Sequence, residues 1–143
     1  MTAKKPARER HKRKGNLYGT GAKGKATRLH SKIIRHGGVC AMCGSTENLQ
    51  CAHIISRNYD RTRTDLRNAL PLCARDHLAQ SYFSPIDISL LWLDKYGKRL
   101  YKQLVKQAKE GEKKDWDKEV IFLEGVLKRL DDGEVLDFKE LYR

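Results

Sequence analysis

The sequence has no apolar run that approaches the roughly 20 residues of a membrane-spanning helix, and its N-terminus has no apolar stretch like that of a signal peptide. We therefore expect an intracellular, cytoplasmic protein without membrane association. In a reducing compartment, the four cysteines are expected to be metal ligands or free thiols and not disulfides. Apolar residues make up only 39% of the 143 residues, which is lean for a broad core, so a further cross-link such as a metal ion would help the chain to fold.

Acidic residues are almost absent from the first 35 positions. Twelve basic residues and a single acid, Glu9, give this segment +11 of the chain's net charge of +12. Such a segment gains affinity for a polyanion through counterion release, and the alternative is a solubilising tail. Residues 1–25 are glycine-rich and poor in apolar residues, which predicts a flexible basic arm. Its candidate nucleic-acid contacts are Lys12, Arg13 and Lys14.

The middle of the chain predicts a short helix and a β-β-α unit. Residues 26–36, ATRLHSKIIRH, place Leu29, Ile33 and Ile34 on one helical face, and two glycines follow. Residues 39–58 contain a cysteine knuckle, a turn and the strand-like run LQCAHIIS, which predict a β-hairpin. The polar residues 57–67 are expected to form a loop. Asn68 is interpreted as a helix N-cap, with a helix expected from about Cys73.

Further helices are predicted in the C-terminal half. One begins with Ser84 as its cap and Pro85 at its first position and ends at Gly97, and the next ends at Gly111. The runs WDKEVIFLEGVLKRL and EVLDFKELYR are helical by periodicity. This last part is acidic, and we expect a solvated face, an oligomer contact or a partner-binding element. The predicted divisions are an arm (1–25), a core (26–83), a helical extension (84–110) and an acidic helical tail (111–143).

The cysteine spacing predicts a metal site. Cys40 and Cys43 form a C-x2-C knuckle, whose tight turn directs two thiolates at one ion. Cys73 is a suitable third ligand, and either Asp76 or His77 is placed to be the fourth. We expect a structural Zn2+ ion at this site; the alternative is that the cysteines are small core residues.

His53 becomes a candidate functional residue because of the residues that accompany it. A lone histidine in an apolar run is usually structural, but Asn68, Cys73 and His77 follow at a spacing typical of a metal site. Cys51 precedes His53 by two positions in the expected strand, so both side chains point to one face. Cys51 could be a ligand, although a buried thiol is the preferred interpretation.

These residues together resemble the HNH, or ββα-metal, endonucleases. The resemblance lies in the knuckle, the run CAHIISRNYDRTRTDLRNALPLC and His77, and it is greatest to phage-type members such as NinG-like recombination nucleases and HNH proteins encoded beside terminase genes. The segment SPIDISLLWLDKYGKRLYKQL is similar to a helical extension that trails the motif, so about residues 27–108 are covered. The implied fold class is α+β: a small zinc-stapled ββα-metal (HNH, treble-clef-like) core with a basic N-terminal arm and C-terminal helices.

The resemblance also implies residue roles. His53 matches the general base that takes a proton from the attacking water. Asn68 matches the residue that orients the base through a side-chain to backbone hydrogen bond. His77 matches the last histidine of the family, which ligates a catalytic Mg2+ or Mn2+ ion.

Two positions depart from the family pattern. Ala52 stands where many members have a second ligand of the catalytic ion, and Asp76 stands in place of a fourth cysteine, so two metals compete for His77. Asp65 or phosphate oxygens of the substrate could complete the shell of the catalytic ion. Four arginines between base and asparagine are expected to grip phosphate bidentately rather than to form a solvated loop; they are Arg57, Arg61, Arg63 and Arg67.

The sequence therefore predicts a metal-dependent endonuclease that hydrolyses DNA. Phage packaging or recombination proteins are partners implied by the resemblance alone, and a homodimer through the C-terminal helices is a conjecture. A rival prediction is a non-catalytic zinc module that binds nucleic acid, with His77 as the fourth structural ligand and His53 merely packed. A third is a subunit whose acidic helices bind a larger machine such as a terminase.

Overall fold

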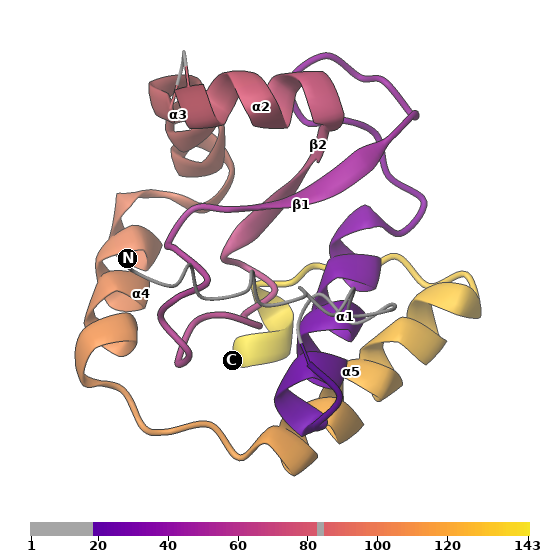
Figure 1. The fold of residues 1–143 in the computed structure, drawn as a ribbon, viewed down its shortest axis with the longest axis vertical. Coiled ribbons are helices and arrows are strands. Elements are labelled where there is room, and N and C mark those ends of the chain that lie inside the picture. Colours follow the sequence, from indigo (N-terminus) through magenta and orange to yellow (C-terminus); the bar gives the residue numbers. More distant parts are fainter. Residues whose placement is uncertain (1–18, 83–84) are drawn as a thin grey trace, which may run out of the picture.

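The computed structural model describes residues 19–82 and 85–143 (Figure 1). These residues form one antiparallel sheet of two strands, β1 (Leu49–His53) and β2 (Ala69–Cys73), with helices around it. The helices are α1 (Ala22–Arg35), α2 (Ala74–Tyr82), α3 (Pro85–Tyr96), α4 (Lys98–Glu110), α5 (Trp116–Asp131) and a 3-10 helix (Glu140–Tyr142). The predicted small α+β class is confirmed at this level. No helix in the described part of the chain is long and apolar enough to cross a membrane.

The sheet pairs β1 with a strand that lies beyond the arginine-rich loop. Leu49 is opposite Cys73 and His53 is opposite Ala69, so residues 54–68 form the connection. The order β-β-α is present, because α2 follows β2 directly, but the second strand is formed by residues 69–73 and does not belong to the predicted hairpin. The predicted loop over residues 57–67 is confirmed too, since it contains turns but no helix or strand.

The hairpin predicted within residues 39–58 is wrong, because the knuckle uses its backbone groups for a turn. The Cys40 amide donates to the Ser45 carbonyl at 2.7 Å, and the Gly44 amide donates to the Cys40 carbonyl at 2.9 Å. Gly44 has a φ of +75°, in the left-handed region that glycine adopts without steric cost. The Ala41 amide then donates to the Pro71 carbonyl at 2.9 Å, which ties the knuckle to β2.

Asn68 does not cap a helix as predicted. It immediately precedes β2, and α2 begins only at Ala74. Its side chain is fully buried and bonds to the loop backbone instead. The asparagine therefore acts within the β-β connection.

Helices α1 and α5 pack side by side on one side of the sheet (Figure 1). Helix α1 begins at Ala22, before the predicted start at residue 26, so residues 22–25 belong to the helix and not to the arm. The predicted apolar face is confirmed, since Ile33 and Ile34 are buried and Leu29 packs against the same cluster. The buried members of this cluster are Ala26, Ile33, Ile34, Leu66, Ala69, Val120, Leu123 and Val126.

Helices α2, α3 and α4 enclose the opposite side. Trp92 of α3 is fully buried there, and its indole N–H donates to the Arg67 carbonyl at 2.6 Å. Helices α3 and α4 are followed by Gly97 and Gly111 as predicted, whereas the predicted cap Ser84 lies outside the described residues. The buried members of this second cluster are Cys40, Ala52, Leu70, Leu72, Cys73, Ile88, Trp92, Tyr96 and Leu104.

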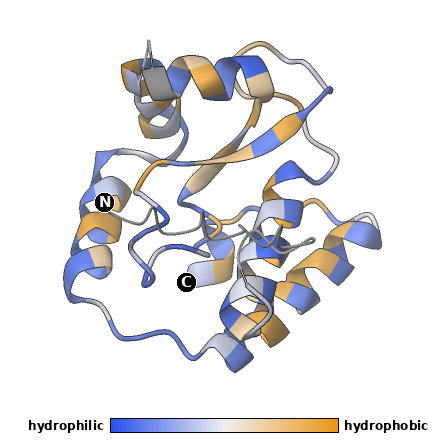
Figure 2. Ribbon diagram, viewed as in Figure 1, coloured by the Kyte–Doolittle hydropathy of each residue, from blue (hydrophilic) through white to orange (hydrophobic). Residues whose placement is uncertain are grey.

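The C-terminal segment 134–143 is not the helix that its periodicity predicts, although the preceding predicted helix is present as α5. Only Glu140–Tyr142 are helical, in a single 3-10 turn. Apolar side chains along the segment pack back on the α1–α5 cluster, and Figure 2 shows its hydrophobic positions beside those helices. The Tyr142 hydroxyl accepts a hydrogen bond from the Leu66 amide at 2.9 Å. Tertiary packing has overridden local helix preference here.

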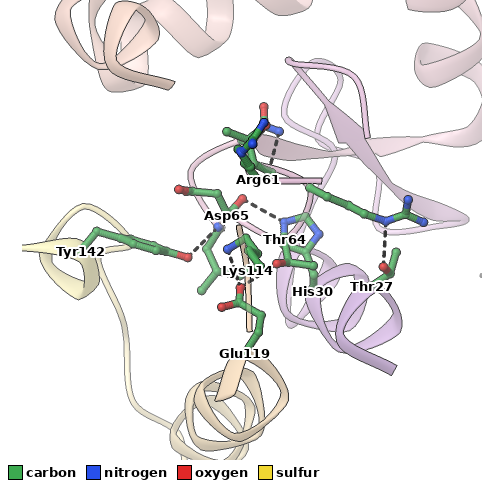
Figure 3. A network of polar contacts seen from close by, with 12 residues as sticks. Thr27, His30, Arg61, Thr64, Asp65, Lys114, Glu119 and Tyr142 are labelled. Atoms are coloured by element: carbon green, nitrogen blue, oxygen red, sulfur yellow. Dashed lines mark hydrogen bonds and ion pairs between the residues drawn. The ribbon is translucent and has the colours of Figure 1, made fainter. Parts of the chain in front are cut away.

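A buried polar network holds the loop between the strands (Figure 3). The Thr64 hydroxyl donates to the Glu119 carboxylate at 2.6 Å, and Lys114 pairs with the same carboxylate at 3.0 Å. Asp65 is fully buried and receives two hydrogen bonds from the Arg67 guanidinium, at 2.9 and 2.7 Å. Because satisfied buried polar groups are costly to separate, this irregular loop has a fixed geometry.

Candidate functional site

Four donor side chains meet where the knuckle, the end of β2 and the start of α2 come together. One ligand atom from each of Cys40, Cys43, Cys73 and Asp76 lies within 4.8 Å of the others. We call this group the knuckle cluster. The two cysteines of the turn come from the knuckle, Cys73 ends β2, and Asp76 is in the first turn of α2.

The spacing within the knuckle cluster fits one tetrahedral ion. Two thiolates at zinc-like bond lengths lie about 3.8 Å apart in a tetrahedron, and a thiolate and an oxygen about 3.6 Å. The Cys43 and Cys73 sulfurs are 3.8 Å apart. The Asp76 Oδ2 atom is 3.1 Å from the Cys40 sulfur and 3.3 Å from the Cys73 sulfur, so a modest outward shift would admit the ion. The cluster is positioned to hold a metal ion.

Asp76, and not His77, is the fourth member of the knuckle cluster. Hydrogen bonds from the thiols of Cys43, Cys40 and Cys73 hold the pKa of Asp76 down to about 2, so the carboxylate is ionised at neutral pH. His77 points its Nδ1 atom at the Gln50 amide oxygen of β1, at 2.7 Å. Asp76 and His77, which the sequence left as alternatives for the fourth ligand, thus point to the cysteines and to β1, respectively.

His53 ends β1, and its Nε2 atom is 2.8 Å from the Arg63 carbonyl oxygen. A carbonyl oxygen only accepts, so Nε2 carries the proton and the lone pair of the neutral ring is on Nδ1. Burial, more than the nearby charges of Arg57, Arg63 and His77, lowers the pKa of His53 below 6.5. The ring is therefore neutral at neutral pH, as a general base must be.

Asn68 fixes the loop that carries this carbonyl. Its Oδ1 atom accepts a hydrogen bond from the Ile55 amide at 2.8 Å. Its Nδ2 atom donates to the Ile55 carbonyl at 3.1 Å and to the Thr62 carbonyl at 3.0 Å. The side chain thus joins the residues just after His53 to those just before Arg63, which is a side-chain to backbone contact of the predicted kind.

Two positions considered for the catalytic ion offer it no ligand. Ala52 is fully buried in the apolar cluster on the α3 side. Asp65, suggested from sequence as a second ligand, is fully buried with its carboxylate held by Arg67, and it belongs to neither group of potential metal ligands in the described residues. The suggestion of Asp65 as a ligand is therefore wrong, because the carboxylate already neutralises a guanidinium.

The four loop arginines differ in what they contact. Arg57 is exposed, whereas the Arg67 guanidinium also stacks 4.2 Å from the Tyr142 ring centroid. Arg63 donates to the Thr27 hydroxyl at 2.9 Å and to the Arg57 carbonyl at 3.3 Å. Arg61 is half-buried, and within the described residues its Nε atom has no hydrogen-bond partner. Arg63 and Arg67 thus stabilise the fold, and Lys12, Arg13 and Lys14 lie outside the described residues.

A second group of donors, His30, Cys51 and His53, was not predicted as a site. One ligand atom from each lies within 4.8 Å of the others, and we call this group the histidine cluster. His30 of α1 is fully buried, and its ring stacks on that of His53 with 5.2 Å between centroids. The sequence pattern that could have indicated this cluster is the position of His30 on the helical face of Ile33 and Ile34, because a buried histidine there needs a polar partner.

Comparisons with protein-family models, with curated proteins and with solved structures gave no match for this chain. The HNH resemblance accordingly rests on the motif residues themselves.

Proposed function

We propose that this chain is a metal-dependent HNH-type endonuclease that hydrolyses DNA phosphodiester bonds. The observation that supports this most strongly is the environment of His53, whose Nε2–H is held by the Arg63 carbonyl in a loop fixed by Asn68. An oriented neutral imidazole with its lone pair on Nδ1 is what general-base activation of water requires. Association with packaging or recombination proteins and homodimer formation stay predictions.

In the proposed reaction, His53 Nδ1 accepts a proton from a water molecule as the water oxygen attacks phosphorus and the bond to the leaving oxygen breaks. Asn68 is a positioning residue, because it acts through the loop. Arg57 is exposed and close enough to His53 and His77 to lower the pKa of both, so it is suited to contact the substrate phosphate.

The donor set fits a catalytic ion that has a single protein ligand. His77 donates Nδ1–H to Gln50, which leaves the lone pair on Nε2 and fixes the ring as a second contact does at metal sites. Mg2+ or Mn2+ held by His77 would take its other ligands from phosphate oxygens and water. Such an ion supplies stabilisation of the charge on the phosphate and the leaving oxygen.

We further propose that the metal of the knuckle cluster is a structural Zn2+ ion. Three thiolates and one carboxylate form a closed tetrahedral set of the kind that zinc accepts. The ion would connect the knuckle, β2 and α2 and so hold His77 relative to β1.

The test compares plasmid cleavage in Mg2+ or Mn2+ by wild type, His53→Ala and a matched control, His36→Ala. His36 is an exposed histidine at the C-cap of α1, and it pairs with Asp131 at the end of α5. We expect His53→Ala to cut at least about 100-fold more slowly and His36→Ala to cut like wild type. Equal rates for wild type and His53→Ala, or no cleavage by folded wild type that carries one zinc equivalent, would overturn the endonuclease proposal.

A second candidate function is a zinc module that binds nucleic acid without cutting it. It is favoured by the buried Ala52 and by the pairing of Asp65 with Arg67, which leave His77 as the one predicted protein ligand of a catalytic ion. Salt-dependent DNA binding by a wild type that never cleaves would support this candidate.

A further inference from the structure

The histidine cluster brings together three donors from two elements on the α1 side of the sheet. His30 comes from the middle of α1, and Cys51 and His53 come from alternate positions of β1, on the side opposite Ala52. His30 is fully buried, whereas Cys51 and His53 are half-buried. An ion would therefore reach the cluster from the side of β1.

The spacing of the histidine cluster matches a shared ion. An imidazole nitrogen and a thiolate bound to one zinc-like ion lie about 3.6 Å apart in a tetrahedron. The His30 Nδ1 atom and the Cys51 sulfur are 3.7 Å apart. The ligand atom of His53 is within 4.8 Å of both, which a small rotation of the half-buried ring can shorten.

The loop already orients both rings as metal ligands are oriented. His30 Nε2 is 3.0 Å from the Asp65 carbonyl, and His53 Nε2 is 2.8 Å from the Arg63 carbonyl. Each carbonyl fixes a proton on Nε2 and leaves the lone pair on Nδ1, as outer contacts do for ligating histidines. Burial lowers the pKa of His30 to about 3, so its ring is neutral at neutral pH.

We propose that His30, Cys51 and His53 form a second transition-metal site that binds an ion of the zinc class, with a fourth position open to water. Imidazole and thiolate ligands select such ions over Mg2+. Binding forms a metal–sulfur bond and releases one proton from the Cys51 thiol to solvent. Burial raises the pKa of the Cys51 thiol to about 12, against smaller opposing effects of Arg35 and Arg57, so the thiol keeps its proton until the ion binds and displaces it.

Occupancy of this site has an effect on activity that rests on the proposed endonuclease function. Coordination of His53 uses the lone pair that would accept the proton from water. Zinc at the histidine cluster and catalysis by His53 are thus mutually exclusive. Zinc in excess of the knuckle equivalent is expected to inhibit cleavage.

The test counts metal ions on the full chain carrying one zinc ion. Zinc is added by equilibrium dialysis to wild type, Cys51→Ala, His30→Gln and, as a matched control, His77→Ala. We expect wild type and His77→Ala to take up a second equivalent. The second dissociation constant should rise more than about 100-fold in Cys51→Ala and His30→Gln, since even outer contacts are worth 10–100-fold.

A measurement on wild type keeps the test independent of how the variants fold. In the nitrogen NMR spectrum of the five histidines, the second equivalent should shift the ring signals of His30 and His53. One equivalent in wild type, a second equivalent that Cys51→Ala retains, or unshifted His30 and His53 signals would each overturn the site. Absent cleavage under all conditions would refute the endonuclease proposal while leaving these counts unaffected.

Discussion

Replacement of Asp76 by alanine should weaken zinc binding at the knuckle cluster, whereas replacement of His77 should not. The Asp76 oxygen is 3.1 and 3.3 Å from two cysteine sulfurs, whereas His77 is directed at Gln50. Structural zinc contributes about 10–16 kcal/mol of apparent binding free energy over four ligands, so one ligand corresponds to roughly 3 kcal/mol. We therefore expect zinc affinity to fall about 100-fold in Asp76→Ala, since 1.4 kcal/mol is tenfold.

The assay is competition for zinc with a chromophoric chelator, with thermal unfolding recorded on the same samples. Asp76→Cys is the matched control, because it restores a fourth ligand at the same position and should bind zinc at least as tightly as wild type. Melting temperatures should follow the zinc affinities, since bound metal stabilises only the folded state. A lower zinc affinity in His77→Ala with an unchanged affinity in Asp76→Ala would refute the assignment of Asp76 as the fourth ligand.

Three further outcomes are expected. Asn68→Ala should lower the free energy of unfolding by about 2–4 kcal/mol in urea titrations, because buried backbone groups of Ile55 and Thr62 lose their partner; an unchanged urea midpoint would contradict this. Burial, ahead of the charges of Asp137 and Asp65, raises the pKa of Tyr96 to about 12. The folded state therefore keeps a proton that the unfolded state loses above pH 10. The free energy of unfolding should accordingly fall by about 1.4 kcal/mol per pH unit between pH 10 and 12. Equal slopes of this free energy against pH in wild type and Tyr96→Phe would be contrary evidence. Deleting residues 1–18, which hold seven basic residues and one acid, should flatten the dependence of DNA affinity on salt in fluorescence titrations, as each lost phosphate contact removes about 0.9 from the logarithmic slope; an unaltered slope would exclude the arm from binding.

Element types were predictable from the sequence because they depend on local periodicity, but pairing was not. The strand around His53 and the helix from Pro85 both follow from their own residues. The partner of β1 lies beyond residues 54–68, and nothing local distinguishes it from the nearer knuckle segment. The helix prediction for residues 134–143 was wrong for the same reason, because Tyr142 is placed by a contact with Leu66, which is far away in the sequence.

Within the candidate site, the cysteine ligands were predictable from spacing, and the histidine cluster was not. The C-x2-C knuckle encodes its own geometry in a turn of a few residues. His30 meets Cys51 and His53 only because α1 packs across β1, and the face pattern of α1 indicates burial without indicating a partner. The choice between Asp76 and His77 depended on where α2 begins, and element ends are the least predictable feature of a sequence.

The one-residue step from Asp76 to His77 would allow one short helix to serve both the knuckle cluster and the proposed catalytic ion. Successive residues of an α-helix point about 100° apart, so with α2 beginning at Ala74 the carboxylate is directed at the three cysteines and the imidazole at β1. Had His77 been the zinc ligand, its ring would have been turned from Gln50 and no histidine would remain for a catalytic ion. The carboxylate in the fourth position therefore favours the proposed role of His77 as the ligand of a catalytic ion.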